Sequence, residues 1–320
     1  MITTLNIERF KSIRTLELSC RRVNVFIGEP NTGKSNILEA LGLLSWLGWA
    51  RPGLNHFVRF SLVQNLFFDN LTDEPLRIQC QGEPAGTLEV EQHDDNFRLY
   101  VDDLERVVLN NRGEETMSLS WPEGTLIRLY RYVPMVRYES SDPGPLIPPH
   151  GPNLFSLVYG SRKLREWLAE LFRPYGFEVL LEPVERTIKV IKREAGILTA
   201  LPLGMASDTL QRILFYTVAM ESNTNSVLVF EEPETHAFPY YTKYLGERIG
   251  TDPSNQYFLS THNPYLLVPL LEKTPKDQVA LFATQYRNYA TTVIPLSEDQ
   301  IGRLLDADPF LGLQAVLETK

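Results

Sequence analysis

Apolar and polar residues alternate in several stretches of the first 130 positions. Residues 2–8 and 13–19 place apolar side chains at roughly every second position, the pattern of strands that bury one face. Between residues 75 and 126, similar runs are separated by Gly, Asp and Asn turns, which predicts an antiparallel β-meander. Residues 126–136 form another strand candidate. The pattern therefore predicts an N-terminal, antiparallel β-rich lobe, with a β-rich insertion over about 75–136.

A second kind of pattern is the uninterrupted apolar run. It occurs at residues 23–27, 226–230, 256–260 and 279–283, and it is typical of strands that are covered on both faces. Helical segments separate these runs in the C-terminal part, and strands that alternate with helices favour a parallel sheet with right-handed crossovers. We therefore expect an α/β protein with a mainly parallel core sheet.

Helical spacing of apolar residues marks the segments that join these strands. It is found at residues 35–49, 164–172 and 209–220. The prolines of residues 142–152 predict an extended loop, and residues 177–181 and 187–191 predict a strand pair. We expect one domain over residues 1–320, with a helical segment over about 153–222 and a C-terminal lobe over about 223–320.

Composition narrows the function classes. The net charge of −9 argues against general binding of polyanions, which needs many clustered cations. The two cysteines form no C-x-x-C pair, so no zinc site is indicated, and low cysteine use fits a reducing compartment. The N-terminus has no signal-peptide pattern, and the most apolar stretch near it is too short to cross a bilayer. We expect a cytoplasmic protein without a membrane partner.

Residues 28–35 match the phosphate-binding pattern G-x-x-x-x-G-K-S. The loop lies between a predicted strand and a predicted helix, which is the context the pattern requires. Gly28 and Gly33 permit positive φ and close approach of the backbone to a ligand. Lys34 supplies a positive charge for the β and γ phosphates, and Ser35 supplies a hydroxyl for Mg²⁺. The backbone N–H groups expected to converge on the β-phosphate at the helix N-terminus are those of Asn31, Thr32, Gly33, Lys34, Ser35 and Asn36.

Two later strands end in side chains suited to phosphoryl transfer to water. The run 227–230 ends in Glu231 and Glu232, at the carboxyl edge where parallel sheets place ligands. We expect Glu231 to reach Mg²⁺ through water and Glu232 to orient or deprotonate the attacking water. The next strand ends in Ser-Thr-His-Asn-Pro. His262 could hydrogen-bond the γ-phosphate or the water, or it could be a structural loop histidine.

Together these motifs resemble the ABC-type ATPases of the RecF/SMC/OLD-like superfamily. The N-terminal sequence Ile7-Glu8-Arg9-Phe10-Lys11-Ser12-Ile13 is similar to the strand turn with which that family begins. The resemblance implies a P-loop nucleotidase fold and ATP and Mg²⁺ as cofactors. It makes Lys34 and Ser35 the Walker A residues, Glu231 and Glu232 the Walker B carboxylates, and His262 the switch histidine.

The resemblance also implies a site shared between two subunits. Ser207 is similar to the family's signature serine, which contacts the ATP of a partner subunit, although Thr209 stands where the family pattern has glycine. Ser207 with Asp208 would also be an ordinary helix N-cap, and the two interpretations are compatible. Gln64 is the candidate for the family's metal-contacting glutamine. We expect an ATP-dependent homodimer.

Several functions are compatible with these motifs. The first is an ATP-hydrolysing switch protein that acts on DNA or on a partner effector protein in genome maintenance or defence. The alternative is a non-hydrolysing, ATP-dependent scaffold or sensor for a separate effector chain. Intrinsic nuclease activity is disfavoured because only 58 residues follow His262 and the acidic pair in Asp306-Ala307-Asp308 fits a loop or helix cap. An ABC transporter subunit is disfavoured because Ser207 lacks the usual neighbours.

Overall fold

The computed structural model describes residues 1–49, 53–118, 126–205, 207–306 and 313. Of the acidic segment 306–308, only Asp306 is among them. The chain forms two compact units. The first comprises residues 1–129, 225–232 and 246–320, and the second comprises residues 130–224 and 233–245.

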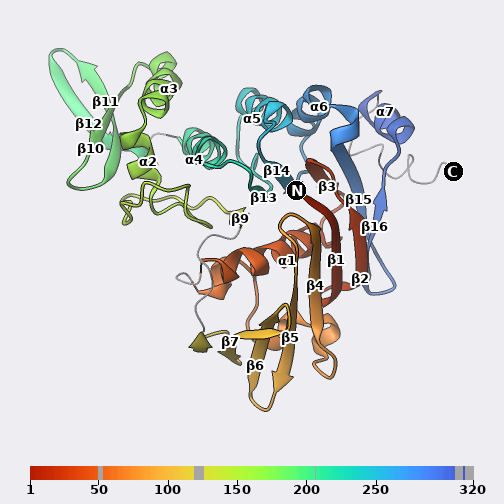
Figure 1. The fold of residues 1–320 in the computed structure, drawn as a ribbon. Coiled ribbons are helices and arrows are strands. Elements are labelled where there is room, and N and C mark those ends of the chain that lie inside the picture. The colour runs from red at the N-terminus through yellow and green to blue at the C-terminus, as the bar shows by residue number, and fades with distance from the viewer. Residues whose placement is uncertain (50–52, 119–125, 206, 307–312, 314–320) are drawn as a thin grey trace. The chain divides into compact units, whose positions relative to one another are not determined.

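In the first unit, an antiparallel sheet confirms the predicted β-rich lobe (Figure 1). Its strand order is β2-β1-β4-β5-β6-β7-β8, and every neighbouring pair is antiparallel. The alternating pattern of the sequence is reproduced as alternating burial, because one face packs on the core. The strands are β1 (Ile2–Phe10), β2 (Ile13–Ser19), β4 (Leu76–Gly82), β5 (Gly86–His93), β6 (Asn96–Val101), β7 (Leu104–Asn110) and β8 (Glu115–Ser118).

The uninterrupted apolar runs form four adjacent strands of the second sheet, whose strand order is β16-β15-β3-β14-β13-β9. Strands β15, β3, β14 and β13 are parallel to their neighbours in this group, which confirms the mainly parallel core. A hairpin at the edge, formed by β15 and β16, was not predicted, because β16 mixes apolar residues with threonines. The strands are β3 (Val23–Ile27), β9 (Ile127–Tyr130), β13 (Val227–Glu231), β14 (Gln256–Ser260), β15 (Val279–Arg287) and β16 (Ala290–Pro295).

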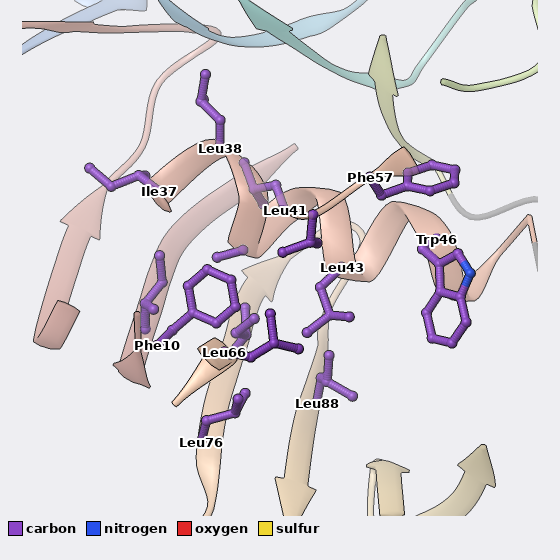
Figure 2. Packing of buried hydrophobic residues seen from close by; sticks show 14 of the residues in the cluster. Phe10, Ile37, Leu38, Leu41, Leu43, Trp46, Phe57, Leu66, Leu76 and Leu88 are labelled. Carbon is purple, nitrogen blue, oxygen red and sulfur yellow. The ribbon is translucent and has the colours of Figure 1, made fainter. Parts of the chain in front are cut away.

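Helix α1 (Lys34–Leu47) contacts both sheets of the first unit: β1 of the antiparallel sheet and β13 and β14 of the parallel sheet. Figure 2 shows Leu41 and Leu43 of this helix packed in a cluster with Leu76 and Leu88 of the antiparallel sheet. A helix covered on several sides needs an apolar surface nearly all round. This explains why residues 37–47 are almost continuously hydrophobic.

The other helices of the first unit follow strands of the second sheet. They are α6 (Pro264–Lys273) and α7 (Glu298–Asp306), together with part of α5 (Pro239–Thr251), which has residues in both units. The short 3-10 helices of the chain are η1 (Leu54–His56), η2 (Val63–Leu66), η3 (Phe68–Asn70), η4 (Arg173–Tyr175), η5 (Leu203–Met205) and η6 (Lys276–Gln278).

The second unit combines helices with a small antiparallel sheet. The predicted strand pair forms β10 (Glu178–Glu182) and β11 (Thr187–Glu194), and an unpredicted third strand, β12 (Ile197–Pro202), pairs with β11. The predicted helices are present as α3 (Arg162–Phe172) and α4 (Asp208–Ser222), with a short helix α2 (Leu154–Gly160) before them. The proline-rich loop 142–152 has no helix or strand, as predicted.

Candidate functional site

The loop between β3 and α1 has the backbone geometry of a phosphate cradle. Gly28 and Gly33 have φ values of 150° and 94°, and Gly33 is the left-handed N-cap of α1. Asn31 is also left-handed, with φ 62°. Successive turns of this kind direct backbone N–H groups toward one point, which creates a site for an anion at the positive end of the helix dipole.

Lys34, the first residue of α1, folds over this loop. Its Nζ donates hydrogen bonds of 2.8 Å to the carbonyl oxygens of Gly28 and Glu29, and the residue is buried. Burial lowers the pKa of Lys34, while the charge of Glu232 opposes that shift. A nearby phosphate stabilises a buried ammonium whose other partners are neutral carbonyls, because the phosphate supplies negative charge as well as hydrogen-bond acceptors.

Glu232 and His262 lie at the carboxyl ends of neighbouring parallel strands. Glu231 of β13 is the register partner of Ser260 of β14, so the residues that follow both strands emerge at one edge. The N–H of Glu232 donates to the Ser260 carbonyl at 3.2 Å, and Glu232 adopts φ 42°. His262 Nδ1 lies 3.3 Å from Glu232 Oε1. The geometry thus pairs a carboxylate with an imidazole, an arrangement that can hold and orient a water molecule.

An ion-pair network next to these residues was not predicted from the sequence. Glu39 of α1 is fully buried, and its carboxylate pairs with Lys11 and, at 2.6 Å, with Arg59. Arg59 also reaches Glu231 at 3.2 Å. Burial would lower the pKa of Arg59, but the charges of Glu231 and Glu39 outweigh it and raise that pKa. The network thus connects the helix after the loop to the end of β13.

The sequence contained one signal for this network. Glu39 is a single carboxylate within an otherwise apolar stretch of helix, and such a residue needs a buried partner. The identity of that partner could not be predicted. Arg59 lies 20 positions away in the sequence, in a segment of irregular structure, and only the folded chain brings the two together.

The residues present fit a Mg²⁺ site in which waters and phosphates supply most of the ligands. No cluster of three or more His, Cys, Asp or Glu side chains that could hold a metal occurs in the described part of the chain. Mg²⁺ is commonly bound by one or two protein oxygens together with waters and substrate phosphates. Ser35 in the first turn of α1 and Glu231 at the end of β13 fit that chemistry, since one offers a hydroxyl and the other a carboxylate that is 18% exposed.

Two further predicted site residues are Gln64 and Ser207. Gln64 belongs to η2 in the first unit, and its assignment to the metal stays a prediction. Ser207 belongs to the second unit, where its hydroxyl accepts from the N–H of Leu210 at 3.4 Å and caps α4. Thr209 Oγ1 donates to the His236 carbonyl at 2.9 Å within the same unit. The structure therefore confirms the N-cap, while the contact of Ser207 with a partner's nucleotide stays a prediction.

Comparison with protein-family models and with curated protein sequences gave no match. Solved structures do match. An SMC head bound to the C-winged helix domain of ScpA superposes with a TM-score of 0.56 at 13% identity, over 94% of this chain and 99% of that chain. An SMC head domain with an extended coiled coil, bound to the C-terminal domain of ScpA and derived from Pyrococcus furiosus, has a TM-score of 0.52 at 12% identity, over 95% and 98%. The chain thus shares the fold of SMC head domains.

Among the helices that the structure describes, none combines the length and the hydropathy needed to cross a membrane.

Proposed function

We propose that the chain binds ATP together with Mg²⁺, hydrolyses it, and uses the cycle as a switch. The observation that carries this proposal is the meeting of three features in one unit: the glycine loop with buried Lys34, the carboxylates that end β13, and the 3.3 Å pair of Glu232 with His262. A shared fold alone would not carry it, because one fold supports many functions.

The residues divide the chemistry as phosphoryl transfer to water requires, mainly by positioning and by stabilising charge. The loop amides and Lys34 hold the phosphates, and Lys34 exchanges its two carbonyl partners for phosphate oxygens. Bound Mg²⁺ would neutralise phosphate charge and would be held by Ser35 and, through water, by Glu231. Glu232 accepts a proton from the attacking water, and His262 orients that carboxylate.

The second unit contains the residue that we propose to contact a second copy of the chain. We propose that Ser207 contacts ATP bound to a second copy of the chain, so that ATP closes a homodimer and hydrolysis opens it. The SMC heads named above were solved with domains of a partner protein. We accordingly propose a separate protein in the cytoplasm, rather than DNA, as the target of the switch.

ATP turnover by the wild type and by Glu232→Gln tests this function. Removing a general base typically costs 10²–10⁴-fold, so we expect turnover to fall at least about a hundredfold. The affinity for ATP should change by less than about threefold, because phosphate binding depends on the loop. Glu272→Gln, at an exposed carboxylate of α6, is the control and should leave both values unchanged.

Each outcome separates one alternative. Wild type that binds ATP but turns it over no faster than Glu232→Gln would refute the enzyme and leave the non-hydrolysing sensor. Wild type that binds no ATP would refute both. Incubation of DNA with the protein and Mg²⁺ or Mn²⁺ should leave the DNA intact, and cleavage would instead support a nuclease.

A further inference from the structure

The β15–β16 hairpin packs against the phosphate-binding loop. Strand β15 runs parallel to β3, with Ala283 as the register partner of Ile27. The next residue of β15, Thr284, therefore lies beside the start of the loop. Its hydroxyl is 2.6 Å from the hydroxyl of Thr32 and donates to the Ile27 carbonyl at 3.1 Å. Thr284 thus ties the end of β3 to the middle of the loop.

A second threonine of the same hairpin is hydrogen-bonded, through Ser12, to the other end of the loop. Thr291 of β16 is buried, and its hydroxyl is 2.6 Å from the hydroxyl of Ser12. Asn36 Nδ2, in the first turn of α1, donates to that same Ser12 oxygen at 2.6 Å. The Thr291 N–H also donates to the Ser12 carbonyl at 2.7 Å. The hairpin therefore reaches the helix end of the loop through one bridging side chain.

The two threonines also explain why the loop needs its glycines on steric grounds. A Cβ at Gly28 would lie 2.4 Å from Thr284 Oγ1, and a Cβ at Gly33 would lie 1.9 Å from Thr291 Oγ1. Both distances are far shorter than a van der Waals contact. The hairpin is consequently packed against the loop at both glycines, and the loop cannot shift toward β15 and β16.

We propose that Thr284 and Thr291 are positioning residues for the phosphate-binding loop, a role that rests on the proposed ATP site. Their hydroxyls hold Thr32 and, through Ser12, Asn36 in the conformation in which the loop amides converge. Neither threonine contacts the nucleotide in this account. The hairpin acts on affinity through the shape of the loop, because a preorganised site avoids the cost of ordering the loop on binding.

The test measures binding of a fluorescent ATP analogue with Mg²⁺ to Thr284→Val and Thr291→Val. Valine keeps the β-branched shape and replaces the hydroxyl with a methyl group. A buried hydrogen bond lost in this way typically costs about a factor of ten, so we expect the Kd to rise about tenfold in each variant. Thr284→Ser and Thr291→Ser restore the hydroxyl and should bind within about threefold of wild type. Thr292→Val, at an exposed position of the same hairpin, should bind as wild type does.

A purely stabilising role predicts a different result. In that case the valine variants would have a lower Tm and an unchanged Kd at temperatures well below it, and the proposal would be overturned. Hydrogen exchange of residues 28–36 in nucleotide-free protein gives an independent measurement. Faster exchange in the valine variants, restored by serine, supports the proposal, whereas unchanged exchange overturns it. If wild type binds no nucleotide, the proposed function fails, while the exchange experiment still decides whether the hairpin holds the loop.

Discussion

The two compact units differ in how they hold the residues expected to meet ATP. In the first unit, the buried Lys34 donates hydrogen bonds to two carbonyl oxygens, and Glu232 is paired with His262. In the second unit, Ser207 has the contact that any helix N-cap makes, and Ser161 makes the same contact at the start of α3. The residues proposed to meet ATP in the first unit are therefore held by specific buried or paired contacts. The geometry of the second unit is common to many helices, so its role must be tested by function.

The largest expected effect is on cysteine reactivity in the first unit, which contains both cysteines of the chain. Burial raises the pKa values of Cys20 and Cys80 to about 12. An unfolded thiol has a pKa of about 8.5, and only the thiolate reacts with alkylating agents. At pH 8, alkylation of folded protein should therefore be about a thousandfold slower than in denaturant, and the native rate should rise with pH.

Alkylation followed by mass spectrometry measures this difference. Fast labelling at pH 8 without denaturant of Cys80, a buried residue of β4, would mean that the antiparallel sheet of the first unit opens readily. That result would contradict the comparison, since a tightly held site could not rest on such a sheet.

The charge network of the first unit gives the next largest effect. Glu39→Gln removes the charge of the buried α1 carboxylate that pairs with both Lys11 and Arg59, and breaking a buried pair costs about 3–5 kcal/mol. We expect at least about 2 kcal/mol here, because the Arg59 side chain is 59% exposed and solvent screens part of the interaction. Urea unfolding measures the change.

The matched control is an exposed pair of the second unit. Glu166 lies 2.7 Å from Arg162 on α3, and Glu166→Gln should cost at most about 0.5 kcal/mol, as exposed pairs do. Equal losses for Glu39→Gln and Glu166→Gln would remove the energetic difference between the two units.

The smallest effect is expected at the helix cap of the second unit. Ser207→Ala should lower stability by about 1 kcal/mol, because an N-cap hydroxyl satisfies one N–H of the first turn. It should leave the Kd of ATP for a single copy unchanged and should weaken ATP-dependent dimerisation, measured by light scattering after size exclusion.

Ser161→Ala provides the control, since it removes an equivalent cap from α3. It should lower stability by a similar amount and leave dimerisation intact. If both variants dimerise equally well on ATP, Ser207 is a helix cap and nothing more.

The sequence predicted those features whose chemistry lies in a local pattern. The loop 28–35, the paired carboxylates after β13 and the histidine after β14 stand in their predicted strand and helix contexts, and the α/β fold class is confirmed. The functional roles of the site residues stay predictions. Arg59, Thr284 and Thr291 were missed, because each acts through a partner that only the tertiary fold brings close. Strands β12 and β16 were missed because their patterns are mixed and they pair within hairpins.

Titration of the protein with a fluorescent ATP analogue in Mg²⁺ tests the central claim most directly, with Lys34→Ala measured in parallel. Lys34 is the charged group that the loop holds in place, and a charge-assisted contact to a desolvated phosphate is worth about 2–5 kcal/mol when one partner is truncated. The account predicts saturable binding by the wild type and affinity at least about thirtyfold weaker for Lys34→Ala. Equal binding by the two proteins, or no binding by either, would contradict it.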